Sequence, residues 1–166
     1  MYRLCEIYSR ARSVAPPWKI SIKLFGAARQ SEAAVIAVDT NVLVRLLVVD
    51  DEKQTQAATR YLSAHCSSAE PALVSDIVLV ECAWVLSDVY EYSRAQVGDA
   101  IDGLLATAQL RAANPTGIGA ALQRFRASTA DFADCLIGVN NVSSGCEYTA
   151  TFDRKASKLP EFRLLS

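Results

Sequence analysis

Histidine is almost absent from this sequence, and its scarcity excludes several kinds of active site. The single histidine, His65, lies in the polar stretch 63–68, where we expect it at the surface. Without a second histidine the chain cannot build a metal site from several imidazoles. Nucleophilic catalysis by a triad is also not expected, because His65 is alone and poorly placed to act as its base.

Paired cysteines are missing as well. The cysteines are odd in number, widely spaced and contain no CxxC pair: Cys5, Cys66, Cys82, Cys135 and Cys146. This pattern favours neither a disulfide framework nor a zinc site, and it indicates a reduced, cytoplasmic protein. Cys82 and Cys135 fall inside apolar, helix-like segments, where cysteine acts as a small core residue.

Long apolar runs and a strong excess of one charge are also missing. No stretch approaches the roughly 20 apolar residues that cross a bilayer, so no membrane partner is expected. With 166 residues, of which 51% are hydrophobic, the chain suits one domain with a filled core.

Residues 1–33 carry six basic and two acidic residues, whereas the remainder carries eleven basic and sixteen acidic residues. Because an acidic body binds phosphate poorly, nucleic-acid binding here would require metal ions and local basic residues.

The first 33 residues differ from the rest in their pattern. They show no clean periodicity, and the prolines in Ala15–Trp18 interrupt any helix. We interpret residues 1–33 as a loosely ordered extension or a mis-assigned start, although an Arg-rich, acid-poor start also suits a transit peptide. Residues 34–166 form the predicted domain.

Strands and helices alternate in that domain. The pattern predicts strands at 35–38, 72–74, 110–113, 146–152 and 163–165. It predicts helices at 42–48, 53–64, 77–90, 94–107, 116–125 and 132–141. This alternation indicates an α/β fold, a three-layer α/β/α sandwich with a central, mostly parallel sheet.

Four carboxylates stand alone within apolar runs of this domain: Asp39, Glu81, Asp134 and Asp153. An ionised acid on a buried surface is costly unless a cation meets it. Asp39 and Asp153 each follow a predicted strand, and parallel sheets bind ligands at the carboxyl ends of their strands. Helical spacing from Ile77 and Trp84 predicts that Glu81 lies on a buried face. We expect the acids to converge on one pocket and to hold Mg²⁺ or Mn²⁺, which prefer oxygen ligands.

Each acid also has a simpler interpretation. Asp39 can cap the helix that follows it, and Asp153 can end a strand in a turn. Glu81 can belong to a buried ion pair, as can Asp134 with Arg124 or Arg126 as partner. Further polar residues near the acids are helix caps or turn residues that could also line the pocket: Thr40, Asn41, Asp131 and Thr151.

The motifs together resemble those of PIN-domain nucleases, and most closely the VapC toxins of bacterial toxin–antitoxin pairs. The resemblance rests on the D-T-N element at 39–41, Glu81, the D-F-A-D element at 131–134 and the T-F-D element at 151–153. It covers about Val35 to Leu165, in order and at appropriate spacing.

The resemblance implies single-strand RNA cleavage that depends on Mg²⁺ or Mn²⁺. It maps the family's acids onto Asp39, Glu81, Asp134 and Asp153, as catalytic residues and metal ligands. It maps Thr40, Asn41, Thr151 and, less firmly, Asp131 onto the positions that line the pocket. It also implies a homodimer and a small antitoxin that silences the enzyme.

Three basic residues near these motifs are candidate RNA contacts: Arg45, Arg154 and Lys155. They could equally be solvated charges on helix faces. The alternatives to the toxin are another PIN-type RNA-processing or DNA nuclease and a non-enzymatic binding module. A phosphotransferase with Asp39 as nucleophile is disfavoured, because the second aspartate that it needs is replaced by Asn41.

Overall fold

A computed structural model describes residues 36–166 of the chain. The helices within these residues are α2 (Thr40–Leu47), α3 (Glu52–His65), α4 (Asp76–Trp84), α5 (Arg94–Leu105), α6 (Pro115–Ala127) and α7 (Phe132–Ser143). The strands are β1 (Ala72–Val74), β2 (Leu110–Ala112), β3 (Thr149–Thr151) and β4 (Phe162–Leu164). A π-helical turn, η1 (Val85–Val89), continues α4, and a 3₁₀ turn, η2 (Ala156–Lys158), precedes β4. The predicted extension at 1–33 lies outside the described residues.

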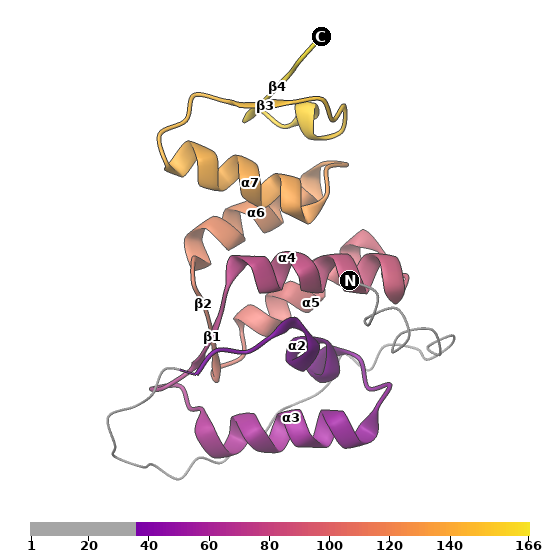
Figure 1. Cartoon of the computed structure of the whole chain (residues 1–166), viewed down its shortest axis with the longest axis vertical. Helices are drawn as coiled ribbons and strands as arrows, with labels where there is room; N and C mark the ends of the chain where they lie inside the picture. The colour runs from indigo at the N-terminus through magenta and orange to yellow at the C-terminus, as the bar shows by residue number, and fades with distance from the viewer. Residues whose placement is uncertain (1–35) are drawn as a thin grey trace.

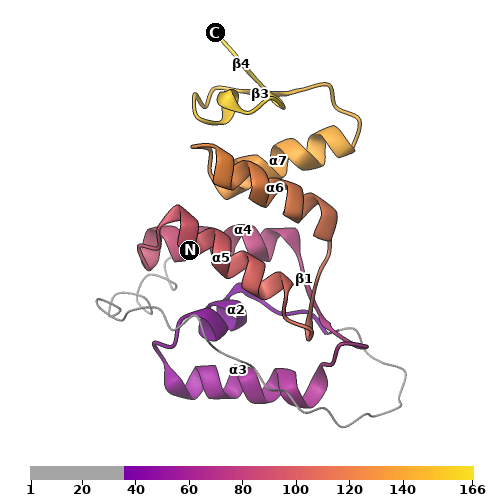
Figure 2. The same cartoon turned by 180° about the vertical axis from the view of Figure 1, so that it is seen from behind.

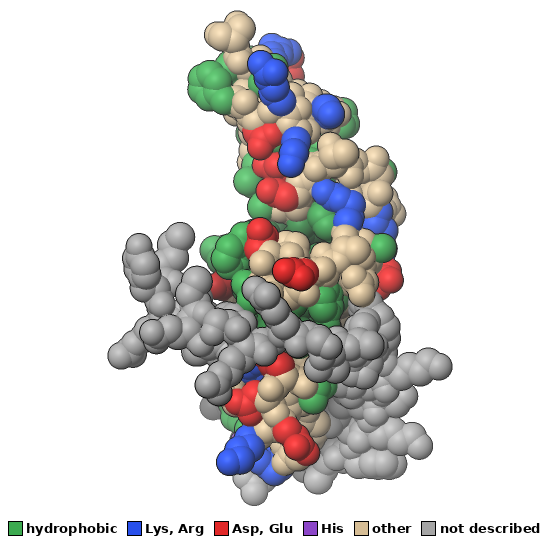
Figure 3. Space-filling model, turned by 90° about the vertical axis from the view of Figure 1, so that its right-hand side faces the viewer, with side chains coloured by type: hydrophobic (Ala, Val, Ile, Leu, Met, Phe, Trp, Pro, Cys, Tyr) green, Lys and Arg blue, Asp and Glu red, His purple; other side chains and the backbone are tan. Residues whose placement is uncertain are grey.

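The elements are stacked along the long axis of the molecule. Figure 1 shows α3 and α2 at one end, α4 and α5 above them, and then α6 and α7. Strands β3 and β4 lie at the opposite end, beyond α7, and the view from behind in Figure 2 shows the same order. The space-filling view in Figure 3 shows acidic and basic side chains on successive levels of this stack.

The strands pair in parallel, as the sequence predicts, but they do so two by two. Strand β1 pairs with β2, and β3 pairs with β4. The predicted strand at 35–38 is represented by a parallel bridge between Ala37 and Leu73, supported by hydrogen bonds from Leu73 N to Ile36 O and from Val38 N to Leu73 O. The α/β class with parallel strands is therefore confirmed. In place of one central sheet, residues 36–166 contain two small, separate sheets.

The β3–β4 pair is held against helix α7. The ring of Phe162 packs over Gly138 of α7, where an added Cβ would lie 2.8 Å from the ring carbon Cε2. Asn141 of α7 donates a hydrogen bond to the Thr149 hydroxyl at 2.9 Å. These side-chain contacts hold the second sheet against α7. The three-residue strands contribute few backbone hydrogen bonds of their own.

We expect Gly138→Val to destabilise the protein by about 1–3 kcal/mol, because a side chain there overpacks the contact with Phe162. Gly119→Ala is the matched control, since nothing lies within 4 Å of a Cβ added at this position of α6. Alanine there should stabilise the helix by about 0.5–1 kcal/mol. The free energies of unfolding from chemical denaturation measure both effects, and equal stability of the two variants would contradict this packing.

Local chemistry sets where the helices begin. Ser75 accepts a hydrogen bond from Val78 N at the start of α4, and Ser93 forms a full capping box with Gln96 at the start of α5. Asn114 caps α6, which opens with Pro115. The predicted helix at 77–90 is confirmed with a change of helix type, because α4 ends at Trp84 and a π-helical turn continues the helix to Val89.

The apolar side chains that the sequence places on helical stripes form one core. Among its fully buried members are Leu43, Leu79, Ile101, Ile118, Cys82 and Cys135. Burial and the neighbouring Glu81 raise the pKa of the Cys82 thiol to about 12. The role predicted for Cys82 and Cys135 as small core residues is confirmed. His65 is exposed, as expected, and stacks on Tyr61.

None of the helices within residues 36–166 combines the length and the apolar composition that a membrane crossing requires.

Candidate active site

The first group of site residues lies where α2 meets α4. Thr40 is the first residue of α2 and is buried, and its hydroxyl donates a hydrogen bond to Glu81 Oε2 at 2.6 Å. Asp39 occupies the N-cap position of α2, but its side chain makes no capping bond. Instead, Asp39 Oδ2 accepts a hydrogen bond from the Asn41 side-chain amide at 3.3 Å. The structure thus joins Thr40 to Glu81 and Asn41 to Asp39, and it does not support a capping role for Asp39.

The second group lies where the start of α7 meets the loop after β3. Asp131 caps α7, since its Oδ1 accepts a hydrogen bond from Asp134 N at 2.8 Å. The pKa of Asp134 is raised to about 6, first by burial and then by the negative charges of Asp131 and Asp153. Asp131 and Asp153 therefore lie close enough for their charges to disfavour the ionised form of Asp134.

The backbone holds Asp153 as an ionised carboxylate. Its Oδ1 accepts hydrogen bonds from Lys155 N at 2.5 Å and Ala156 N at 3.1 Å. These two bonds lower the pKa of Asp153, the one from Lys155 most strongly. Asp153 N in turn donates to the Thr151 hydroxyl at 2.9 Å. Thr151 and Asp153 thus belong to one hydrogen-bonded turn. The pKa of Asp153 is lowered there, whereas the pKa of nearby Asp134 is raised.

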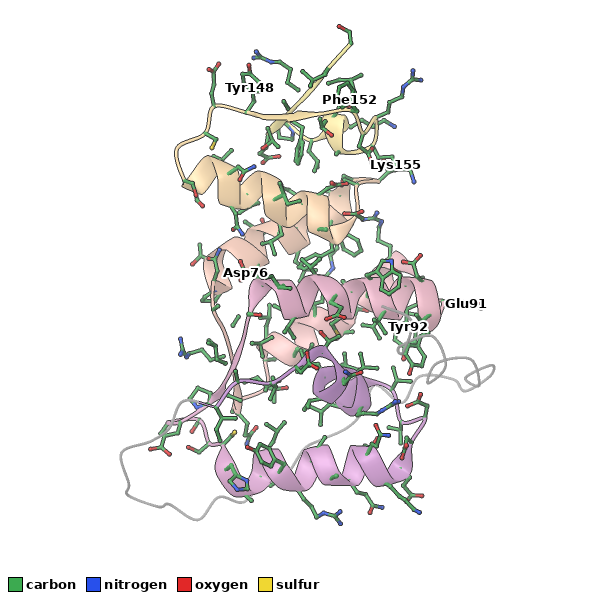
Figure 4. The ribbon with its side chains drawn as sticks, viewed as in Figure 1. Asp76, Glu91, Tyr92, Tyr148, Phe152 and Lys155 are labelled. Atoms are coloured by element: carbon green, nitrogen blue, oxygen red, sulfur yellow. The ribbon has the colours of Figure 1, made fainter. Side chains whose placement is uncertain are left out.

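The two groups do not merge into a single cluster. Within residues 36–166, no three carboxylate, thiol or imidazole side chains are grouped so that they could hold one metal ion together. The two groups are nevertheless connected by neighbouring helices, since α4 carries Glu81 and α7 carries Asp134. Asn140 of α7 donates a hydrogen bond to Asp76 Oδ2, at the start of α4, at 3.1 Å. Figure 4 labels Asp76 at this end of the helix.

Glu81 lies at the edge of the buried face that the sequence predicts for it. Glu81 is half-buried, and its Oε2 accepts the hydrogen bond from the buried Thr40 hydroxyl. Val85, four residues later, is buried, whereas Ile77 and Trp84 are 79% and 57% exposed. The core side of α4 is formed by Leu79 and Cys82. Because α4 is apolar on nearly all sides, spacing alone could not identify the face that meets the core.

Arg45 also requires a correction. The sequence suggests it as an RNA contact, but its side chain is 6% exposed and forms an ion pair with Asp50. Its Nε donates a further hydrogen bond to Gln54 Oε1 at 2.8 Å. Arg45 therefore links α2 to the start of α3. Arg154 and Lys155, the other two candidates, are exposed beside Asp153.

The cations suggested as partners of Asp134 contact other acids. Arg124 pairs with Glu161, and Arg126 pairs with Asp99 at 3.0 Å and with Asp102 at 2.7 Å. Burial raises the pKa of Asp134, and so do the negative charges of Asp131 and Asp153. No basic side chain is among the causes of this shift. The interpretation of Asp134 as half of an ion pair with Arg124 or Arg126 is therefore not supported.

The second group fits a hard divalent cation in the kind and number of its donors. Mg²⁺ is usually bound by one or two carboxylates and completes its coordination with waters and substrate phosphate oxygens. Asp134 and Asp153 supply two carboxylates that interact electrostatically, and Asp153 is already oriented by backbone N–H groups. A cation beside them would offset the repulsion between these carboxylates.

Two exposed aromatic residues near the acids in sequence were not among the predicted site residues. Trp84 follows Glu81 by three residues, and Phe152 immediately precedes Asp153. Phe152 is 79% exposed. The signal that could have found them is a large aromatic residue adjoining a lone acid.

Comparison with known proteins agrees with the motifs. A model of the PIN domain matches residues 36–161, a span that includes both groups of acids. No curated protein matches the chain significantly.

Proposed function

Because the chain belongs to the PIN-domain family, whose members are generally metal-dependent nucleases, we propose that it is an endoribonuclease that uses Mg²⁺ or Mn²⁺. The observation that carries this proposal is the second group. Asp134 is surrounded by the negative charges of Asp131 and Asp153 without a compensating basic side chain among the groups that shift its pKa. Such an arrangement favours a cation held by oxygen atoms.

In this proposal each group of acids has its own part. Asp134 and Asp153 hold the metal, and Asp39 and Glu81 complete the catalytic set from α2 and α4. The bound ion would neutralise charge on the phosphate and lower the pKa of a water molecule. The hydrogen bond from Thr40 orients the Glu81 carboxylate. The backbone N–H groups of Lys155 and Ala156 orient the Asp153 carboxylate.

The substrate proposed is single-stranded or looped RNA. Arg154 and Lys155 are exposed next to Asp153, where their charges can contact the RNA backbone and offset the acidity of the site. Asn41 donates a hydrogen bond to the Asp39 carboxylate, and the Thr151 hydroxyl accepts one from Asp153 N, so each helps to position an acid.

We further propose that the enzyme is the toxin of a type II toxin–antitoxin pair and acts as a homodimer. The D-T-N, D-F-A-D and T-F-D elements support this narrower assignment. A short reading frame next to the gene that encodes a DNA-binding antitoxin would support it. A nuclease that binds no such partner would instead be an RNA-processing or DNA enzyme.

Metal removal tests the proposal directly. We expect EDTA to abolish cleavage of a fluorescent single-stranded RNA, and we expect Mg²⁺ or Mn²⁺ to restore it, because the acids alone cannot neutralise the phosphate. The full chain is assayed against RNA and DNA strands of the same sequence, so that substrate class is read in the same experiment. RNA cleavage that continues at the same rate in EDTA would reject the metal-dependent mechanism, and binding without any cleavage would favour the non-enzymatic module.

A further inference from the structure

Each group of acids has a solvent-exposed aromatic side chain beside it. Trp84 is 57% exposed and lies three residues after Glu81, whereas Phe152 is 79% exposed and lies directly before Asp153. Aromatic side chains of this size are usually buried or at interfaces, because their transfer out of water is favourable. Their exposure at both acid groups therefore indicates a ligand with flat, apolar surfaces.

The helix geometry places Trp84 on the same side of α4 as Glu81. Residues three apart are neighbours on a helix surface. Leu79 and Cys82 occupy the opposite, buried side, so the indole ring cannot turn into the core without displacing them. The ring of Trp84 is thus presented to solvent on α4, one helical turn from Glu81.

Phe152 is presented by a fixed turn. The hydroxyl of Thr151 and the carboxylate of Asp153 accept backbone hydrogen bonds on both sides of it. Figure 4 shows Phe152 and Lys155 at the same end of the molecule, above α7. A flat apolar ring, an ionised acid and two exposed basic residues, Arg154 and Lys155, therefore occupy one short segment.

We propose that Trp84 and Phe152 are stacking platforms for the bases of a single-stranded nucleic acid. The inference rests on the proposed nuclease function and adds the means by which the strand is held. Bases stack on aromatic rings without sequence preference, and exposed basic residues bind the phosphates between them. Loss of one platform should weaken binding by roughly tenfold, within the range of measured base–aromatic stacking.

The experiment compares a short single-stranded oligonucleotide with an abasic strand of the same length. Affinities are measured by fluorescence anisotropy in EDTA, which prevents metal-dependent cleavage, for the full chain and for Trp84→Ala, Trp84→Phe and Phe152→Ala. We expect each alanine variant to bind the normal strand roughly tenfold more weakly and the abasic strand about as well as wild type. Trp84→Phe should recover most of the affinity, because it keeps an aromatic ring.

Ile77→Ala is the matched control. Ile77 is 79% exposed on the same stripe of α4 but has no ring, so its loss should leave the affinity for both strands unchanged. Circular dichroism confirms that each variant is folded. With Mg²⁺ present, the KM of Trp84→Ala for RNA should rise while kcat changes little, because the residue holds substrate in both the ground and transition states.

The outcomes separate the inference from the function on which it rests. A wild-type protein that cleaves RNA, with unchanged affinity and KM in both alanine variants, would overturn the stacking proposal alone. Variants that shift the monomer–dimer equilibrium in sedimentation without changing affinity would overturn it in favour of a protein interface. A wild-type chain that neither binds nor cleaves the strands would overturn the proposed function itself.

Discussion

Replacement of Asp134 by asparagine should lower the rate of RNA cleavage by about 10³-fold while the protein remains folded. Loss of a metal-binding carboxylate removes several kcal/mol of charge stabilisation from the transition state, and about 1.4 kcal/mol corresponds to a factor of ten in rate. In the absence of metal, this substitution should not lower the free energy of unfolding. Burial and the charges of Asp131 and Asp153 already raise the pKa of Asp134, so a neutral side chain relieves repulsion.

Two measurements on this variant distinguish a catalytic acid from a structural one. Single-turnover cleavage at saturating Mg²⁺ gives the rate, and thermal unfolding in EDTA gives the stability. Asp131→Asn is the matched control, because asparagine also caps helices and should preserve the bond to Asp134 N. Cleavage by Asp134→Asn within tenfold of wild type, or a large loss of its stability in EDTA, would remove Asp134 from the metal site.

The features that the sequence predicts well are those decided by neighbouring residues. The helix starts at Ser75, Ser93, Asn114 and Asp131 follow from side chains that satisfy free N–H groups within three residues. The core positions of Cys82 and Cys135 follow from apolar surroundings on the same helix. In each case the relevant partner lies within one helical turn, so the pattern contains the information.

The pairing of the strands depends on contacts that no local pattern contains. Strands β3 and β4 are held to α7 because the Phe162 ring packs against Gly138, which has no side chain and lies 24 residues earlier. Nothing in the residues near either position signals this approach. Alternation of strands and helices therefore predicted the parallel direction but could not predict the division into two sheets.

The candidate site shows the same contrast between local and long-range contacts. Asp131 contacts Asp134 through a local helix cap. Thr40 and Glu81 are 41 positions apart and meet only because α2 packs against α4. The mutual position of the two groups of acids depends on how α4 packs against α7, which apolar spacing does not fix, since α4 is apolar on almost every side. The motif sequence therefore identified the acids but not the separation between the two groups.

Arg45 shows how nearness in sequence can mislead. It lies six residues after Asp39, which suggested an RNA contact, but its side chain is buried and bonds to Asp50 and Gln54. Burial raises the pKa of Asp50, and hydrogen bonds from Tyr90 and Arg45, together with the charge of Arg45, outweigh that effect. The net pKa lies below its ordinary value, so this ion pair stabilises the fold.

Arg45→Met should destabilise the protein by about 2–3 kcal/mol, because it leaves the Asp50 carboxylate with the hydrogen bond from Tyr90 but without its cation. Since the pKa of Asp50 is lowered in the folded state, its contribution is present above its unfolded pKa of about 3.9 and is lost as the pH falls through the folded value. The stability difference between wild type and variant should therefore be large at neutral pH and shrink below about pH 4.

Chemical denaturation at several pH values measures this difference, and the KM for RNA is measured alongside it. Arg154→Met is the matched control, because Arg154 is exposed beside Asp153 and should change stability by less than about 0.5 kcal/mol while raising the KM. Arg45→Met should show the reverse, a large stability loss with an unchanged KM. If the Arg45→Met variant instead kept its stability and showed a raised KM, Arg45 would be assigned as an RNA contact. The ion pair with Asp50 would then not stabilise the fold.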